Sequence, residues 1–228
     1  MGNLLPIFHG KGKQVRKSTS SLRQKIFNIT KRITDIIAST LFLILLIPLI
    51  VLLFFFYTFG QSKGPLFFKQ ERIGKDRKKF VIYKFRTMEV NAEESLKANE
   101  ALYLKYIEND YKLNPSEDPR VTSIGKFLRK TSIDEIPQFY NVLKGDMSLV
   151  GPRPVIELEL TEYGDRVNEL LSVKPGITGY WAMCGRSDIK YPERIDLELF
   201  YIYNQGLSLD VKIIIKTIWL VFTKKGAY

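Results

Sequence analysis

The sequence predicts an α+β protein that attaches to a membrane through one interrupted apolar helix. The first observation is an almost wholly apolar stretch at residues 36–59, with Pro48 at its middle. The second is a pair of stretches rich in aromatic and β-branched residues, 65–74 and 80–88, which are typical of strands. The third is a set of later segments with apolar residues at helical spacing, at 132–143, 193–205 and 207–228.

Charge is distributed unevenly along the 228 residues. Residues 1–34 hold eight of the 35 Lys and Arg residues and none of the 24 Asp and Glu residues, so the remainder carries only +3 of the net charge of +11. A basic tail beside an apolar segment is attracted to anionic lipid headgroups. A nucleic-acid-binding protein would carry its basic patch on the folded body. We therefore expect residues 1–30 to form a basic, disordered tail, and we expect no nucleic acid to bind.

Histidine and cysteine are nearly absent, which limits the available chemistry. The single cysteine, Cys184, rules out an internal disulfide and a CxxC motif. The single histidine, His9, lies in the tail, so histidine-based triads and multi-histidine metal sites are excluded unless the tail folds into a site. Cys184 is interpreted as a small packed residue. Catalysis must rest on carboxylates, Lys, Arg, Tyr or a hard cation.

The apolar segment is long enough to cross a bilayer. Residues 36–59 would span about 36 Å as a straight helix, at about 1.5 Å per residue. Pro48 removes a backbone hydrogen bond and bends or breaks that helix. Basic residues flank both ends of the segment, and such residues favour the cytoplasmic side. A re-entrant helix-break-helix hairpin satisfies both observations, and a kinked full span is the alternative on these residues alone.

The two strand-like stretches can pair as a small β hairpin across residues 74–79. Lys84 and Arg86 would then share one face, because side chains alternate along a strand. That face is either a phosphate-facing strip or an ordinary solvated surface. The next segment, 89–118, holds eight acidic and three basic residues and is predicted to be helical and largely solvated. We assign it no chemistry.

Adjacent carboxylates, Asp134 and Glu135, follow at the start of a predicted helix. Thr131 or Ser132 is a suitable N-cap, and Ser132-x-x-Glu135 matches a capping box. A structural interpretation therefore stands beside a catalytic one. The neighbouring Arg129 favours chemistry on a phosphate.

A rigid Pro152-Arg153-Pro154 turn closes this region. A guanidinium binds phosphate through two parallel hydrogen bonds, which makes Arg153 a candidate phosphate ligand. Arg186, in the polar loop 185–188, is another cation available for an anion. No Walker A loop or GxGxxG motif occurs, so no P-loop or Rossmann site is predicted. The last segment, 207–228, has an aromatic and lysine rim that suits an amphipathic helix at a membrane interface, with a core helix as the alternative.

Taken together, these motifs resemble the bacterial sugar transferases, the monotopic polyprenol-phosphate phosphoglycosyl transferases, over roughly residues 31–228. Each motif alone is weak, but so many in one order are specific. They are QERIG at 70–74, KFRTM at 84–88, DPRV at 118–121, SIDEIPQ at 132–138, NVLKGDMSLVGPRP at 141–154 and KPGITG at 174–179.

The resemblance implies an activity and the residues that carry it. A UDP-sugar, with UDP-galactose or UDP-glucose favoured, would give hexose-1-phosphate to undecaprenyl phosphate and release UMP. Asp134 would be the nucleophile that forms a covalent phosphosugar intermediate, and Glu135 would hold Mg²⁺, which prefers oxygen ligands. Such an intermediate predicts ping-pong kinetics. The remaining substrate-binding candidates are Lys84, Arg86, Arg129, Pro152, Arg153, Pro154 and Arg186.

The resemblance also implies an arrangement in the cell. It favours the re-entrant hairpin, broken at Pro48, for residues 31–60. Residues 61–228 would form a cytoplasmic or interfacial sugar transferase domain, with amphipathic helices around a catalytic core on the cytoplasmic face of the bacterial inner membrane. Undecaprenyl phosphate and membrane lipids would be partners, and a second copy or downstream glycosyltransferases would fit as protein partners. The reaction would start exopolysaccharide, capsule or O-antigen synthesis.

Two other functions compete. One is a catalytically inactive, membrane-tethered scaffold of polysaccharide assembly, which the intact Asp134–Glu135 pair disfavours. The other is a polytopic transferase without a covalent intermediate, which the single apolar segment disfavours. Some larger family members carry a multi-span N-terminal region, and we expect this chain to lack any function of those spans.

Overall fold

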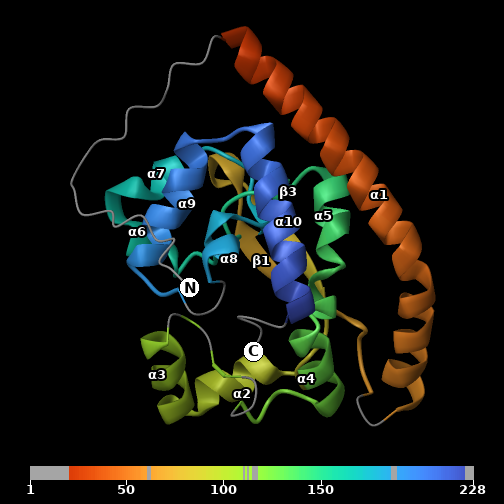
Figure 1. The fold of residues 1–228 in the computed structure, drawn as a ribbon. Coiled ribbons are helices and arrows are strands. Elements are labelled where there is room, and N and C mark those ends of the chain that lie inside the picture. Colours follow the sequence, from red (N-terminus) through yellow and green to blue (C-terminus); the bar gives the residue numbers. More distant parts are fainter. Residues whose placement is uncertain are drawn as a thin grey trace.

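The computed structural model describes residues 21–60, 63–109, 111, 113–114, 118–185 and 189–223. In this part of the chain, helices surround two small sheets (Figure 1). The helices are α1 Ser21–Phe59, α2 Ala92–Ala98, α3 Glu100–Glu108, α4 Ser123–Lys130, α5 Gln138–Lys144, α6 Leu160–Tyr163, α7 Val167–Leu170, α8 Tyr180–Cys184, α9 Glu193–Tyr203 and α10 Leu207–Thr223. The strands are β1 Phe67–Ile73, β2 Lys79–Phe85, β3 Ser148–Val150 and β4 Gly176–Thr178, and the 3-10 turns are η1 Lys75–Arg77, η2 Ile133–Glu135 and η3 Gly164–Arg166.

α1 is one helix that runs along the outside of the body and curves with it (Figure 1). Pro48 lies inside this helix, and helical structure continues on both sides. The predicted break at Pro48 is therefore not confirmed, and the helix begins at Ser21, before the predicted start at residue 31. A proline bends a helix without ending it where the residues on both sides are held. Leu46 and Leu53, which flank Pro48, are both buried against the body.

Both ends of α1 are attached to the same folded body. Near its start, Lys31 Nζ donates to Oδ2 of Asp210 in α10 at 2.6 Å. Arg32 donates to two carbonyl oxygens at the end of α5, at 2.6 and 2.8 Å, where the helix dipole favours a cation. Near the other end, the hydroxyl of Tyr57 donates to the carbonyl oxygen of Arg86.

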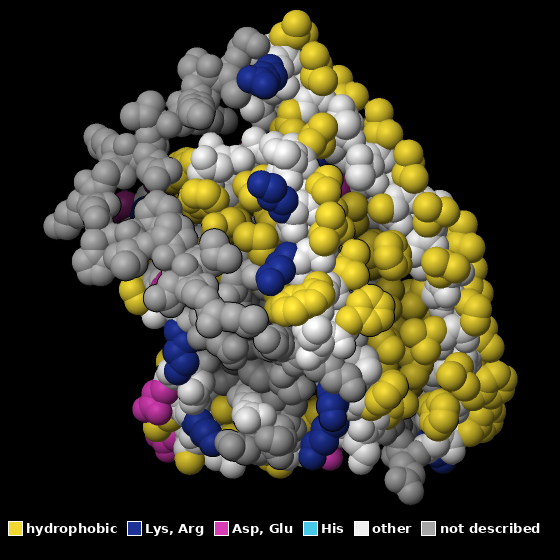
Figure 2. All heavy atoms as spheres, in the orientation of Figure 1, with side chains coloured by type: hydrophobic (Ala, Val, Ile, Leu, Met, Phe, Trp, Pro, Cys, Tyr) yellow, Lys and Arg dark blue, Asp and Glu magenta, His cyan; other side chains and the backbone are white. Residues whose placement is uncertain are grey.

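The outer face of α1 is apolar and exposed. Only 17% of its most apolar stretch is buried inside the molecule, which is unlike the core helix of a soluble protein. Figure 2 shows hydrophobic side chains along α1 and over the adjoining face of the body. A single long helix of this kind fits a membrane-anchored protein. Its exposed residues include Leu41, Ile44, Leu45, Ile47, Val51, Leu52, Phe54, Phe55, Phe56 and Phe59.

The predicted β hairpin is confirmed. β1 and β2 pair antiparallel, from Phe67 opposite Phe85 to Ile73 opposite Lys79. The connection is short and includes η1, so the two strands are neighbours in the chain and in space. Ile82 of β2 packs on Val142 of α5, which fixes the hairpin against the centre of the molecule.

The second sheet was not predicted. β3 and β4 are three-residue strands that pair in parallel, and part of the predicted turn at 174–179 is β4. Glycine is required here, because a Cβ added to Gly176 would lie 2.1 Å from the backbone nitrogen of Gly151. This close approach positions the turn at residues 152–154, whose Pro152 carbonyl oxygen accepts from the Gly176 N–H at 2.8 Å.

The C-terminal helices are as predicted. α9 is nearly as long as the predicted 193–205 segment, and α10 covers most of 207–228, of which residues 224–228 lie outside the described part. α10 is amphipathic: Ile213 is fully buried, whereas Phe222 is 82% exposed and Trp219 is also exposed. Lys216 lies over the Trp219 ring at 4.2 Å from its centroid. An aromatic and lysine rim of this kind suits a lipid headgroup region.

Candidate active site

One large cleft brings the predicted chemistry together. Its volume is about 1020 Å³, and its walls come from the β hairpin, α2, α3, α4, η2 and α8. Such a volume suits a ligand of nucleotide-sugar size. Six of the predicted site residues line it: Lys84, Arg86, Arg129, Asp134, Glu135 and Arg153. Arg186 lies outside the described residues.

The two carboxylates lie on a tight turn and not on the start of an α-helix. Asp134 and Glu135 belong to η2, and α5 begins only at Gln138, after Pro137. Ser132 has a left-handed backbone with φ of 56° and makes no side-chain capping bond. The capping-box interpretation, one of the two that the sequence left open, is therefore wrong at Ser132. Pro137 has no N–H to continue a helix from this turn, although it suits the first turn of α5.

Asp134 is held in an unfavourable electrostatic setting. Its exposure is 8%, and burial together with the negative charge of Glu135 raises its pKa to about 6. Lys84 and Arg129 oppose this shift. A buried carboxylate that ionises near neutral pH, beside cations, is typical of a functional group and not of a helix cap.

Lys84 pairs with the neighbouring carboxylate. Its Nζ donates to Oε1 of Glu135 at 2.6 Å. Lys84 comes from β2 and Glu135 from η2, so this contact joins the hairpin to the carboxylate turn. Lys84 lines the cleft and is partly buried, so the hairpin face is not an ordinary solvated surface at this residue, and its contact with phosphate stays a prediction.

Arg129 reaches the same region from the end of α4. Its Nε donates to the Thr87 hydroxyl at 2.9 Å, which fixes the guanidinium within the cleft wall. Burial lowers the pKa of Arg129, and the charge of Asp134 raises it. An arginine stays cationic under such a shift, so Arg129 is a positioned positive charge near Asp134.

Arg86 and Asp118 have structural partners. Arg86 donates to the carbonyl oxygens of Pro65 and Met88, at 2.7 and 3.0 Å, and its guanidinium lies 4.9 Å from the Tyr57 ring centroid. Asp118 accepts from Nε and Nη2 of Arg120 at 2.8 and 2.7 Å. Both residues border the cleft, but these contacts hold its walls together.

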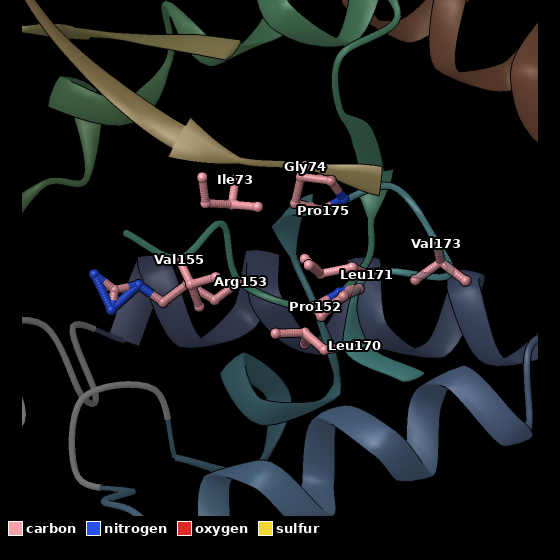
Figure 3. Close-up of a pocket in the computed structure, with 9 residues that line it drawn as sticks. All are labelled: Ile73, Gly74, Pro152, Arg153, Val155, Leu170, Leu171, Val173 and Pro175. Atoms are coloured by element: carbon pink, nitrogen blue, oxygen red, sulfur yellow. The ribbon is translucent and has the colours of Figure 1, made fainter. Parts of the chain in front are cut away.

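The two prolines of the turn at residues 152–154 do not line the cleft. Pro152 lies with apolar neighbours around a void of about 10 Å³, too small for a ligand (Figure 3). In the same view the Arg153 side chain extends away from these apolar residues. The Pro154 carbonyl oxygen accepts from Nη1 of Arg72 at 3.2 Å. Of the three turn residues, Arg153 alone lines the main cleft.

The carboxylate turn has the donor chemistry for a hard cation. Glu135 is 37% exposed at its side chain, and Asp134 is adjacent to it on the cleft wall. A divalent cation would oppose the burial and the charge repulsion that raise the pKa of Asp134. Mg²⁺ is commonly held by one or two carboxylates with substrate phosphates as further ligands. No cluster of three potential ligands occurs in the described part of the chain, so the two carboxylates fit such an ion only together with a substrate.

Sequence reasoning missed several residues of the cleft. The acidic segment at 89–118, to which no chemistry was assigned, supplies α2 and α3 and places Tyr103 and Tyr106 on the wall. Arg72 of β1 and Trp181 of α8 line it as well. The alternation of side chains along the paired strands could have identified Arg72, because it places Arg72 on the same face as Lys84. No local pattern points to the tyrosines.

Comparison with known proteins finds a matching family and several relatives. The sequence profile described as "Bacterial sugar transferase" matches residues 26–224. The chain is 42% identical over 212 residues to the undecaprenyl-phosphate galactose phosphotransferase of Salmonella typhimurium, which covers 92% of this chain and 44% of that protein. It is 38% identical over 218 residues to the exopolysaccharide production protein ExoY of Sinorhizobium fredii, covering 94% of each.

A third relative is the UDP-glucose:undecaprenyl-phosphate glucose-1-phosphate transferase of Escherichia coli. The identity is 37% over 211 residues, which is 88% of this chain and 42% of that protein. The chain therefore spans less than half the length of the Salmonella and Escherichia relatives and nearly all of ExoY.

Proposed function

This chain belongs to the bacterial sugar transferase family, and we propose that it transfers hexose-1-phosphate from a UDP-sugar to undecaprenyl phosphate with release of UMP. The observation that carries the proposal is Asp134, a buried carboxylate of raised pKa in a cation-lined cleft. The names of the relatives favour galactose or glucose as the hexose. ExoY supports a role in exopolysaccharide production.

In the first half-reaction, a carboxylate oxygen of Asp134 attacks the β-phosphorus of the UDP-sugar. The bond from that phosphorus to the oxygen that bridges the two phosphates breaks, and UMP leaves with the bridging oxygen. The product is a phosphosugar joined to Asp134 through an acyl phosphate (mixed anhydride) bond. The raised pKa of Asp134 leaves the carboxylate reactive near neutral pH, because a nucleophile that is too strongly stabilised attacks slowly.

In the second half-reaction, a phosphate oxygen of undecaprenyl phosphate attacks the same phosphorus. The bond between the phosphorus and Asp134 breaks, which regenerates the carboxylate and yields undecaprenyl diphosphohexose. Both acceptor and donor are anionic, so the cations around Asp134 reduce their mutual repulsion. Lys84 and Arg129 are the cleft residues best placed for this role.

A bound Mg²⁺ would supply positive charge to the diphosphate as it reacts. Glu135 would hold it beside the nucleophile Asp134. Lys84 already neutralises part of Glu135 through the 2.6 Å contact. This contact orients the carboxylate toward the cleft.

Attachment to the membrane brings the lipid acceptor to this site. The exposed apolar face of α1 would enter the lipid, and the exposed face of α10 would lie at its surface. Because both ends of α1 are attached to one body, we propose that both lie on the cytoplasmic face and that α1 is re-entrant. Ile133 and Ile136, on either side of the carboxylates, pack against the α1 cluster, so Asp134 lies on the membrane side of the cleft.

The test is a transfer assay with purified protein. Protein in nanodiscs is incubated with Mg²⁺, undecaprenyl phosphate and each of several UDP-sugars, and UMP release is measured. We expect release with UDP-galactose or UDP-glucose and its loss in Asp134→Asn. Absence of release with every sugar, or release undiminished by Asp134→Asn, would overturn the proposal.

A further inference from the structure

The cleft continues well beyond the catalytic carboxylates. Its other end is walled by α3, which presents Tyr103 and Tyr106 on successive turns. Both side chains are half-buried, and their ring centroids lie 6.3 Å apart with the planes tilted by 32°. These paired rings therefore form one aromatic surface on the cleft wall. The function described so far uses neither residue.

The register of β1 and β2 gives the distance between the carboxylate end of the cleft and the end walled by α3. Lys84, which contacts Glu135, lies opposite Phe68, and residues 68, 70 and 72 alternate onto the same face of β1. Arg72 is four residues along from Phe68, or about 13 Å at about 3.3 Å per residue. A diphosphate and a ribose together extend over a length of that order. That length is measured to the Arg72 backbone, and the guanidinium turns back along the strand, where Nη2 donates to Oε1 of Gln70 at 2.5 Å. A nucleotide sugar whose reacting phosphorus lies at Asp134 therefore directs its other phosphate toward the Arg72 guanidinium and its nucleoside beyond it.

The far end also contains buried donor groups without an acceptor among the described residues, although Nη1 of Arg72 lies 3.8 Å from Oε1 of Glu159. Nε of Arg72, Nη1 of Arg153 and Nε1 of Trp181 are buried without a hydrogen-bond acceptor in the described part of the chain. Burial and the neighbouring charge of Arg153 lower the pKa of Arg72 to about 10. Two guanidinium groups held close together, with donors to spare, form a site that an anion would complete.

The tyrosine surface adjoins these cations. Burial and then the charge of Glu159 raise the pKa of Tyr106, and the charges of Arg72 and Arg153 act on its hydroxyl group in the opposite direction. The aromatic surface and the two guanidinium groups are therefore parts of one site. An aromatic face beside a phosphate-binding pair matches the two halves of a nucleoside monophosphate, because any base stacks on an aromatic ring.

The position of this site relative to α1 indicates which substrate it binds, the nucleotide-sugar donor or the lipid acceptor. Asp134 lies beside residues that pack on α1, whereas α3 lies on the opposite side of the molecule from α1 (Figure 1). A lipid-linked acceptor arrives along α1. The far end of the cleft is therefore assigned to the water-soluble nucleotide sugar.

We propose that Tyr103 and Tyr106 bind the base of the nucleotide donor and that Arg72, together with Arg153, binds the phosphate attached to its nucleoside. This assignment rests on the proposed function, since it takes the donor to be a nucleoside diphosphate sugar. Tyr103, Tyr106 and Arg72 are binding residues that do not take part in bond making at Asp134.

The test uses UMP, the released nucleotide, as the probe. UMP binding to the full-length protein in nanodiscs is measured by calorimetry, and donor and acceptor KM values are measured in the transfer assay. In Tyr106→Leu and Tyr103→Leu we expect UMP affinity to fall about tenfold, as for the loss of one stacking contact. The donor KM should rise in parallel, while kcat and the acceptor KM stay within about twofold. Tyr106→Phe keeps the ring and should bind UMP within about threefold of the wild type. Leu104→Ala is the matched control, because Leu104 lies on the same helix, is exposed and does not line the cleft.

The outcomes separate the two proposals. Failure of the wild-type protein to release UMP from any UDP-sugar overturns the proposed function. Normal transfer with UMP affinity unchanged in both Leu variants overturns the nucleoside site alone. A loss in Tyr106→Phe equal to that in Tyr106→Leu also overturns base stacking, since the ring would then be insufficient. Arg72→Gln should weaken UMP binding more than uridine binding, and an equal loss for both ligands contradicts its phosphate role.

Discussion

Nζ of Lys84 lies 2.6 Å from Oε1 of Glu135, directly beside the buried carboxylate of Asp134. The contact neutralises one of two adjacent negative charges. Burial, and then the negative charge of Glu135, raise the pKa of Asp134, whereas Glu135 is partly exposed and paired. This difference in environment separates the roles of two neighbouring acids that are chemically alike.

Asp134→Asn should abolish transfer without weakening the fold. The amide is no substitute for a carboxylate nucleophile, so we expect UMP release to fall by about 10³-fold or more. The folded-state pKa is raised, so ionisation of Asp134 costs stability as pH rises through about 6. Asparagine removes that cost, and the melting temperature at pH 7.5 should be unchanged or higher. A large drop in melting temperature would indicate that Asp134 is structural, as the capping interpretation held.

The acid limb of the pH–rate profile should report Asp134. Below about pH 6 the carboxylate is increasingly protonated, so kcat/KM should fall about tenfold per pH unit. Lys84→Met removes a cation that lowers the pKa of Asp134, so this limb should move to higher pH, by about one unit.

A matched control for the pH experiment is Lys79→Met. Lys79 is on the same strand as Lys84, is largely exposed and pairs with Glu71 at 2.8 Å, away from the cleft. Its loss should leave the acid limb in place. A limb that stays fixed in Lys84→Met as well would contradict the link between Lys84 and Asp134.

Local sequence patterns predicted the helices and strands that depend mainly on neighbouring residues. The β hairpin follows from alternating aromatic and β-branched residues on both sides of a short turn, and α9 and α10 follow from helical periodicity. The pair Asp134 and Glu135 was identified with its surrounding cations. The backbone of the pair was not, because the left-handed Ser132 and the short 3-10 turn depend on packing against α1 and not on the capping signal.

Contacts between segments far apart in the chain could not be predicted from local sequence patterns. The three-residue strands β3 and β4 carry no periodic signal, and their pairing depends on the close approach of Gly151 and Gly176. Arg86 was predicted as a phosphate contact, but its partners at Pro65 and Met88 depend on how the strand ends. The acidic segment at 89–118 was expected to be solvated, since nothing local shows which side of α3 faces the cleft.

Asp118→Asn should destabilise the protein, and more so at neutral pH than in acid. Asp118 and Arg120 are both buried, so breaking the pair costs about 3 kcal/mol by leaving a buried guanidinium without its partner. Burial alone would raise the pKa of Asp118, but the hydrogen bonds and charge of Arg120 bring it below its ordinary value. The wild type therefore loses this contribution as pH falls below about 4. Thermal unfolding followed from pH 3 to 8 should show the two proteins converging at the acid end, and parallel curves would contradict this account.

Labelling the two ends of α1 should place them on the same side of the membrane. Lys31 and Arg32 tie the start of the helix to α10 and α5, and Tyr57 ties its end to the loop after β2. A full span would separate one set of contacts from the body and leave Asp210 without its cation. In a Cys184→Ser background, Leu22→Cys and Lys63→Cys should both react with a membrane-impermeant maleimide in inverted vesicles and be protected in spheroplasts. Labels on opposite sides would reject the re-entrant arrangement and show that the contacts at one end of α1 are absent in the membrane.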